Sequence, residues 1–460
     1  MMVMELTIPR LIVSSYKGKS GKTLVTLAIA YALSKAGFTP SLFKTGPDYI
    51  DASLHGLITG SPSRNLDYVL MGYGIVERLH RYSRGSDIAL IEGVAGLYDS
   101  PSGIDEYGST AQLSKILKAP VLLVINGERI NRTAGALVRG LRQFDPDVKL
   151  IGAVLTNVAS RQVDKLSRII EEEGLPVVGF IPRDEEVEEV FKYRHLGLMH
   201  AREVDEEWLM NVIEKASAHI NVEAVLKLAK EQSEPVKLSL SINDTIPIIK
   251  GVPRIGIMTG RAFTFYYPET IEEAYTLGDV KFIDPERDGE LGDIDILLIG
   301  GGFPEIYASG LEGNRALKSS VRKFIERGGY LYAECGGLMY LTNSIIFNNN
   351  EYEMVGAIDA STIMLSKPIG HGYASAMVIK DTPIAPRGTV LKGHEFHYSK
   401  LILKGNYELA LEYERGFGVN GKDGFLINNA YAHYLHIHPY TYSVLNSIVK
   451  SWSLNPTSQP

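Results

Sequence analysis

The chain has 460 residues, of which 45% are hydrophobic and 22% are charged. This length exceeds what a single hydrophobic core ordinarily organises, so we expect at least two domains. The net charge of -7 gives no indication of a nucleic-acid partner. The single cysteine, Cys335, cannot form a disulfide within its own chain, which fits a reducing compartment.

The ends and apolar stretches of the chain indicate no export or membrane insertion. The N-terminal residues lack the basic start and the continuous apolar core of a signal peptide. No run of about 18 or more apolar residues occurs. We therefore expect a cytoplasmic enzyme with no membrane partner.

The first half alternates short apolar runs with helical patterns. We expect strands at 11–13, 88–91, 121–125 and 150–155, and helices at 23–36, 133–143 and 162–173. Apolar strands that are separated by helices are typical of a parallel sheet covered on both faces. The predicted fold class of this half is therefore α/β, with a P-loop type of parallel sheet.

The stretch 227–251 interrupts this rhythm. It is rich in Lys, Glu, Ser and Pro and shows no sustained period, so we predict a linker there. A second βα pattern then begins, with strands at 254–258, 294–299 and 330–333, and with helices at 321–326 and 441–451. The predicted domains are 1–226 and 252–460.

The segment 17–23 (KGKSGKT) follows a predicted strand and opens a predicted helix, which is the context of a P-loop. Gly18 and Gly21 let backbone N–H groups turn toward phosphate oxygens, and the helix N-terminus adds partial positive charge. We expect Lys22 to contact the terminal phosphates of ATP and the Thr23 hydroxyl to bind Mg²⁺.

Two residues of this turn qualify the motif. Tyr16 occupies the position of the first glycine in the strict pattern G-x-x-x-x-G-K-[ST]. Lys17 is a second basic residue at the turn. It is a candidate ATP-binding residue, although a solvated side chain explains it equally well.

Carboxylates follow two other strands of the same half. Asp48 and Asp51 lie in the segment 44–51 (KTGPDYID), and Glu92 ends the strand at 88–91 beside glycines. Ligands of open α/β sheets gather at the carboxyl ends of the strands. We expect Glu92 and Asp48 to serve the metal of a nucleotide site, whereas Asp51 is a weaker candidate and Asp48 could also be a plain turn residue.

Cys335 lies at a predicted strand–turn–helix corner, in the segment 330–339 (YLYAECGGLM). Such a corner exposes a nucleophile, and the N-terminus of the following helix is expected to lower the pKa of the thiol. Gly336 follows it directly, and Gly302 lies in a triple glycine after another predicted strand. We assign these two glycines to an oxyanion pocket.

A thiol nucleophile needs a base, and histidines cluster at 433–438 (HYLHIH). If this segment is a strand, His436 and His438 share one face. We choose His436 as the base, with His438 as a group that could orient it. A further cluster at 393–399 (GHEFHYS) lacks the spacing of a zinc motif, so substrate contact or ordinary packing is expected there.

These motifs together resemble those of the cobyrinic acid a,c-diamide synthase family over nearly the full length of the chain. The matching segments are 44–51, 92–99, 194–198, 263–268, 300–305, 332–341, 393–399 and 434–438. The resemblance implies that two peripheral carboxylates of a corrinoid, a and c, become amides. It also implies that each amidation uses one L-glutamine and one ATP, with Mg²⁺.

The resemblance further implies a class I glutamine amidotransferase fold for the second half, with Cys335 as nucleophile and His436 as its partner. It associates Asp48, Tyr49 and Asp99 with substrate or metal. In many class I glutaminases a glutamate stands two residues after the histidine, and His438 takes that place here. The third member of a triad is therefore open, and we propose a dyad of Cys335 and His436. A homodimer is open as well.

Other departures and alternatives remain at this stage. Ser15 stands where relatives have the first loop glycine, and Gly260-Arg261 stands where they carry an acid. Nickel-sirohydrochlorin and hydrogenobyrinate are alternative tetrapyrrole polycarboxylates for the same chemistry. A partitioning-type ATPase switch is an alternative of another class, supported by Lys17, and a non-catalytic corrinoid carrier is a third.

Overall fold

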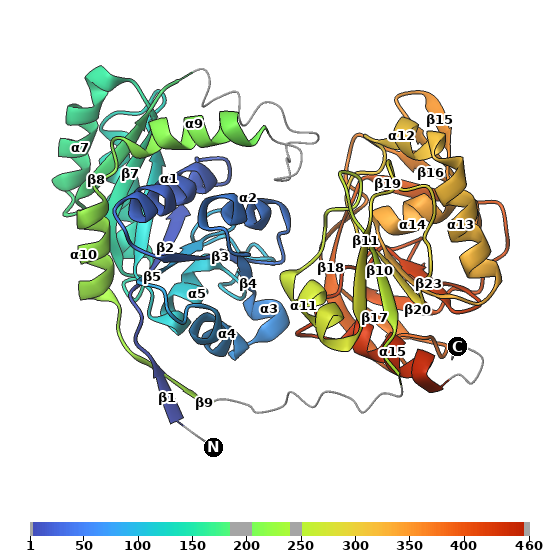
Figure 1. Ribbon diagram of the computed structural model, residues 1–460. Coiled ribbons are helices and arrows are strands. Elements are labelled where there is room, and N and C mark those ends of the chain that lie inside the picture. The colour runs from blue at the N-terminus through green and yellow to red at the C-terminus, as the bar shows by residue number, and fades with distance from the viewer. Residues whose placement is uncertain (1–2, 185–204, 240–250, 455–460) are drawn as a thin grey trace. The chain divides into compact units, whose positions relative to one another are not determined.

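The computed structural model describes residues 3–184, 205–239 and 251–454. The chain divides into two compact units, Met1–Asn243 and Asp244–Pro460 (Figure 1). Each unit has its own sheet and its own hydrophobic core, so we describe them one at a time. Among the described helices, none combines the length and the apolar character that a membrane crossing requires.

The first unit is built on a seven-stranded sheet in the order β4-β3-β5-β2-β6-β7-β8, in which every pairing is parallel. Its strands are β2 (Arg10–Ser15), β3 (Pro40–Thr45), β4 (Arg64–Leu66), β5 (Ile88–Glu92), β6 (Val121–Asn126), β7 (Leu150–Val158) and β8 (Val177–Pro182). All residues of β2 and β5 are buried. This explains their continuous apolar runs, and the predicted parallel sheet is confirmed.

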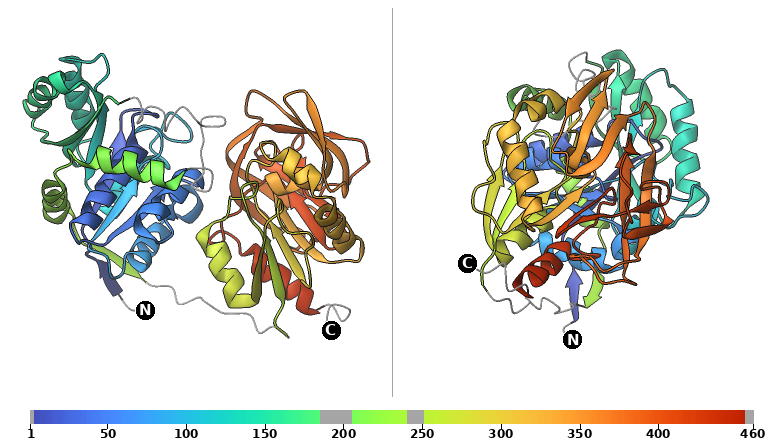
Figure 2. Two further views of the ribbon diagram at one scale, coloured as in Figure 1. Left: turned by 45° about the horizontal axis from the view of Figure 1, so that its top comes forward. Right: turned by 90° about the vertical axis from the view of Figure 1, so that its right-hand side faces the viewer.

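Helices cover both faces of this sheet (Figure 2). They are α1 (Lys22–Lys35), α2 (Ile50–Thr59), α3 (Tyr68–Met71), α4 (Gly74–Tyr82), α5 (Thr110–Leu117), α6 (Thr133–Phe144), α7 (Val163–Glu171), α9 (Glu206–Ser217) and α10 (Val222–Gln232). Alternate residues of β2 enter different cores: Leu11 and Val13 pack with α1, whereas Ile12 packs with α4 and α5. The sheet is therefore the central layer of three.

The predicted linker 227–251 begins too early. Its first residues form the end of α10. Val225 and Ala229 of this helix are buried one turn apart, so the segment has a helical period of apolar residues among its Lys and Glu residues. After it, β9 (Val236–Ser239) pairs antiparallel with β1 (Val3–Leu6). The boundary between the units lies at Asn243/Asp244, and residues 240–250 lie outside the described residues.

The second unit is built on a six-stranded sheet in the order β11-β10-β12-β13-β23-β22. Its strands are β10 (Arg254–Met258), β11 (Asp279–Ile283), β12 (Ile296–Ile299), β13 (Tyr330–Glu334), β22 (Phe425–Ile427) and β23 (Ala430–His433). They are parallel except for β22, which pairs antiparallel with β23 at the edge. The predicted βα pattern of this half is confirmed.

Helices and two smaller sheets complete the second unit. The helices are α11 (Pro268–Leu277), α12 (Ala308–Gly313), α13 (Arg315–Glu326), α14 (Gly336–Leu341) and α15 (Val444–Leu454). One small sheet has the order β15-β14-β16-β19, with strands Asn350–Glu353, Thr342–Phe347, Ile358–Met364 and Ser399–Leu403. The other has the order β18-β17-β20-β21, with strands Val390–His397, Gly370–Val378, Leu411–Arg415 and Lys422–Asp423.

The expected strand over the late histidines ends earlier than predicted. β23 stops at His433, and the chain then leaves the central sheet to form a bridge between His436 and His394 of β18. The two backbones exchange hydrogen bonds of 2.8 and 3.0 Å. Because His394 lies some forty positions upstream of His436, a local sequence pattern does not predict this change of direction.

Candidate active sites

The phosphate loop of the first unit connects β2 to α1. Gly21 precedes the helix with a φ of 92°, a left-handed conformation that suits glycine. The ammonium of Lys22 bends back to the Ala95 carbonyl at 2.6 Å and to the Lys17 carbonyl at 3.5 Å. Burial, with a smaller contribution from the Lys44 charge, lowers the pKa of Lys22 to about 8. The loop therefore holds a poorly solvated cation at the N-terminus of α1.

The Lys17 side chain lies 5.4 Å from the centre of the Tyr16 ring, on an exposed part of the loop. Gly18 has open space around the position of a side chain. The Lys17 carbonyl thus contacts the Lys22 ammonium, while Lys17 itself is exposed.

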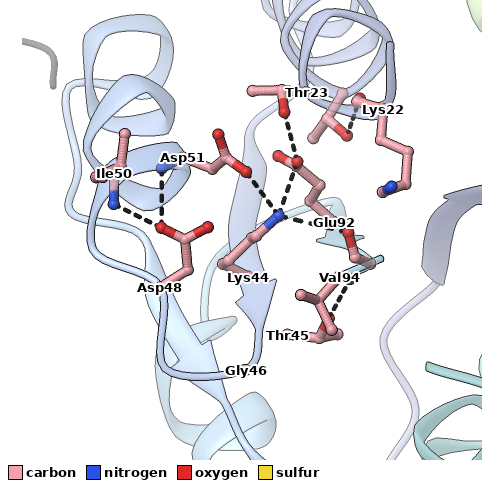
Figure 3. Close-up of polar contacts among 12 residues, drawn as sticks. Lys22, Thr23, Lys44, Thr45, Gly46, Asp48, Ile50, Asp51, Glu92 and Val94 are labelled. Carbon is pink, nitrogen blue, oxygen red and sulfur yellow. Dashed lines mark hydrogen bonds and ion pairs between the residues drawn. The ribbon is translucent and has the colours of Figure 1, made fainter. Parts of the chain in front are cut away.

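Glu92 is the centre of a buried polar cluster at the end of β5 (Figure 3). Its Oε1 accepts a hydrogen bond from the Thr23 hydroxyl at 2.7 Å and lies 2.9 Å from the Lys44 ammonium. Its Oε2 lies 2.7 Å from His55 Nε2. Burial alone would raise the pKa of Glu92, but Lys44 and His55 outweigh it and hold the pKa well below its usual range. Glu92 is therefore ionised and held at both oxygens.

Lys44 and His55 were not identified as site residues from the sequence. The Lys44 ammonium bridges Glu92 and Asp51, each at 2.9 Å, and these charges raise its pKa despite complete burial. His55 Nδ1 contacts the Ser63 hydroxyl at 2.8 Å, which fixes the ring toward Glu92. The position of Lys44 at the end of a strand, directly before Thr-Gly-Pro-Asp, is a signal that could have found it.

The other predicted carboxylates lie around this cluster. Asp48 Oδ1 accepts hydrogen bonds from the backbone amides of Ile50 and Asp51, at 2.7 and 3.3 Å, and so braces the start of α2. Desolvation and the nearby Asp51 charge raise the pKa of Asp48 to about 6. Tyr49 is buried at the same turn. Asp99 Oδ2 accepts a 2.7 Å hydrogen bond from the Gly96 amide and so shapes the loop after β5.

Cys335 lies at a sharp corner between β13 and α14, as the sequence predicts. Its φ of 46° and ψ of -97° are unusual for a residue with a side chain, and such strain is common at nucleophiles on a strand-to-helix turn. Its Sγ lies 3.9 Å from the Phe396 carbonyl oxygen of β18. The backbone amide of Cys335 donates to the His433 carbonyl at 2.8 Å, which ties the corner to β23.

The expected depression of the thiol pKa is wrong for this state of the protein. Burial raises the pKa of Cys335, and the Glu305 and Glu334 charges raise it further. The Gly336 amide acts in the opposite direction, but its effect is smaller. Cys335 is thus a thiol in this state, and a nucleophilic role for it would require a base to take the proton.

The two glycines assigned to the oxyanion pocket lie against each other. A Cβ atom on Gly336 would lie 3.0 Å from the Gly302 backbone nitrogen, and a Cβ on Gly302 would lie 2.2 Å from the Ala262 carbonyl oxygen. A Cβ on the neighbouring Gly301 would lie 2.5 Å from His436 Cε1. The geometry therefore brings the corner of Cys335, the triple glycine and His436 into one place.

His436 is buried and its ring is held by neighbours. The His394 ring stacks on it with centroids 5.0 Å apart, and Nδ1 of His436 lies 3.4 Å from Glu334 Oε2. His438 is turned toward other groups: its Nδ1 accepts a 3.0 Å hydrogen bond from the Tyr440 amide, and its Nε2 lies 3.9 Å from Glu269.

Within the cluster at 393–399, Glu395 and His397 contact neighbouring protein groups. Both oxygens of Glu395 accept 2.7 Å hydrogen bonds from the backbone amides of Phe417 and Gly418. His397 donates from Nδ1 to the Ser399 carbonyl at 3.0 Å, while its ring stacks on Tyr434. Across the described ranges, no three His, Cys, Asp or Glu side chains are grouped as metal ligands.

Family models match both units. Residues 11–196 match the CobQ/CobB/MinD/ParA nucleotide binding domain, and residues 254–441 match the CobB/CobQ-like glutamine amidotransferase domain. The two sites and these matches define the class of the protein: a glutamine amidotransferase joined in one chain to a nucleotide-binding domain.

Similar proteins narrow this class. A cobyrinate a,c-diamide synthase of Archaeoglobus fulgidus is 40% identical over 95% of this chain and 96% of its own. Those of Methanosarcina acetivorans and Listeria innocua are 37% and 34% identical, over 95% and 94% of this chain and 94% and 96% of theirs. The chain belongs to the cobyrinate a,c-diamide synthase family, and the resemblance noted in the sequence is confirmed.

Proposed function

We propose that this chain catalyses the ATP- and glutamine-dependent amidation of the a and c carboxylates of cobyrinate. The observation that carries the proposal is the presence of two complementary sites in one chain. One is a strained cysteine corner facing two glycines and a histidine. The other is a P-loop whose Thr23 contacts a buried carboxylate.

The second unit would release ammonia from glutamine. The Cys335 sulfur attacks the side-chain amide carbon, and the proton of the thiol passes to His436. The negative oxygen that develops accepts hydrogen bonds from backbone amides of the Gly302 and Gly336 region. His436 then returns the proton to the departing nitrogen as the C–N bond breaks. Ammonia leaves, and water hydrolyses the remaining thioester to glutamate.

The first unit would activate the carboxylate. A carboxylate oxygen of the macrocycle attacks the γ-phosphorus of ATP, so that an acyl phosphate and ADP form. Ammonia then attacks the acyl carbon, and phosphate departs with the amide left in place. Lys22 would offset charge on the transferring phosphoryl group, since its present partners are neutral carbonyl oxygens.

The oxygens near Thr23 fit a magnesium ion. The Thr23 hydroxyl and Glu92 Oε1 lie 2.7 Å apart, and hard oxygen donors of this kind suit Mg²⁺. We propose these two residues as its protein ligands, with Asp48 as a further candidate beside them. In the structure the Lys44 ammonium contacts the same Glu92 oxygen. It would have to move away for Mg²⁺ to bind to that oxygen. When bound, Mg²⁺ would neutralise charge on the phosphates of ATP.

Rival functions have less support. Hydrogenobyrinate and nickel-sirohydrochlorin would suit the same chemistry, and no contact in the structure favours either. A partitioning-type ATPase switch would not require the strained corner of Cys335 or the glycines that face it. A non-catalytic corrinoid carrier would not require a P-loop with a Thr23–Glu92 contact.

A reconstitution tests the proposal. The protein is incubated with ATP, Mg²⁺, glutamine and each of the three macrocycles in turn, and the products are weighed by mass spectrometry. We expect doubly amidated cobyrinate, formed only when both ATP and glutamine are present. If glutamine is hydrolysed and ATP consumed while no macrocycle gains an amide, the proposed substrate class is wrong.

A further inference from the structure

The acid member of the glutaminase site is the group that the sequence leaves open, since His438 stands where many class I enzymes have glutamate. A carboxylate that contacts His436 comes from another part of the chain. Glu334 precedes the nucleophile directly, and its Oε2 lies 3.4 Å from His436 Nδ1. We propose that Glu334 is the positioning residue of the glutaminase: it holds His436 in the orientation and tautomer that serve Cys335.

The strand pairing explains how Glu334 reaches the histidine. In the parallel pairing of β13 with β23, Glu334 stands opposite His433, which is the last residue before the chain turns toward His436. A carboxylate at the end of β13 therefore faces the segment that carries the base. The nucleophile and the acid are consecutive residues on one strand end.

The remaining contacts of Glu334 fix which oxygen faces the base. Its Oε1 accepts a hydrogen bond from the Tyr332 hydroxyl at 2.6 Å and another from the Ile437 amide at 3.2 Å. Two donors on Oε1 orient the carboxylate so that Oε2 points to His436. The Ile437 amide also links the acid to the backbone next to the base.

Two other acids of the second unit have different contacts. Both oxygens of Glu395 are engaged by backbone amides, and Glu269 faces His438. The 3.4 Å separation between Glu334 and His436 exceeds an ordinary hydrogen bond. Catalytic hydrogen bonds are often long in unliganded sites and tighten when substrate binds.

A carboxylate on Nδ1 has a defined chemical effect. It accepts the Nδ1 proton, which leaves Nε2 free as the base, and it stabilises the imidazolium that forms after the thiol proton is taken. An amide in its place presents N–H to Nδ1 and favours the opposite tautomer, with Nε2 protonated. This change removes the base without removing the side chain.

The test compares Glu334→Gln with Tyr332→Phe, which deletes a donor to Oε1 but leaves the carboxylate on His436. We expect Glu334→Gln to lower kcat for glutamine hydrolysis on the order of a hundredfold with little change in KM. Tyr332→Phe should lower kcat less than Glu334→Gln does, because it removes one hydrogen bond to Oε1 but leaves the carboxylate beside His436. Glu334→Asp should recover part of the loss.

Alkylation of Cys335 by iodoacetamide provides a second readout, since it is the only cysteine in the chain. Loss of the base should slow this reaction in Glu334→Gln, while amidation driven by free ammonia should persist and show that the variant is folded. If Glu334→Gln is alkylated and hydrolyses glutamine at wild-type rates, the inference about Glu334 is wrong while the proposed function stands. Because the inference rests on the proposed function, failure of the wild-type protein to hydrolyse glutamine would instead overturn that function.

Discussion

At the scale of single residues, the two buried lysines of the predicted nucleotide site differ in their partners. Lys44 satisfies Glu92 and Asp51, whereas Lys22 has carbonyl oxygens as its hydrogen-bond partners in the structure. The difference appears in their pKa values, since that of Lys44 is raised while burial lowers that of Lys22 to about 8. A bound triphosphate would supply the negative charge that Lys22 lacks.

This difference predicts a pH dependence of nucleotide binding. Below about pH 8 the Lys22 side chain is protonated and attracts phosphate, and above that pH it is increasingly neutral. The affinity for ATP should therefore fall as the pH rises through about 8, by up to about tenfold per pH unit. Calorimetric titration between about pH 7.5 and about pH 9.5 measures it. A variant with Lys22→Met should bind weakly without this slope, and an equal slope in both proteins would contradict the assignment.

At the scale of elements, the glutaminase depends on how closely the triple glycine approaches the base. A Cβ on Gly301 would lie 2.5 Å from His436 Cε1, whereas Gly289, in a turn of the same unit, has open space around it. We expect Gly301→Ala to displace the base and lower glutamine hydrolysis on the order of a hundredfold. Gly289→Ala should leave it unchanged. Steady-state glutaminase assays make the comparison. Equal losses in both variants would mean that the close approach of Gly301 to His436 is not the cause.

The elements also show what sequence patterns can and cannot predict. The buried strands β2, β5, β6 and β7 and the corner of Cys335 follow from apolar runs and from glycine placement. The bounds of β3 were not predicted, because the buried polar residues Lys44 and Thr45 interrupt its apolar pattern. Contacts such as Lys44–Glu92 and Glu334–His436 join distant segments, so spacing along the chain carries no signal of them.

At the scale of the whole molecule, two chemistries occupy two compact units of one chain. If one unit releases ammonia and the other activates the carboxylate, removal of the nucleophile should abolish only the supply of ammonia from glutamine. We expect Cys335→Ser to lose glutamine-dependent amidation while retaining synthesis with high concentrations of free ammonia. Lys22→Ala should lose both, because neither nitrogen source can replace activation by ATP. Product formation from each source, followed by mass spectrometry, distinguishes these outcomes.

The most direct test of the central claim follows the nitrogen itself. Glutamine labelled with ¹⁵N in its side-chain amide is supplied with ATP, Mg²⁺ and cobyrinate, and the product is analysed by mass spectrometry. We predict that both the a and the c amide carry ¹⁵N, and that Cys335→Ser transfers none of the label. Unlabelled amides, or label transfer that continues without the Cys335 sulfur, would contradict the account.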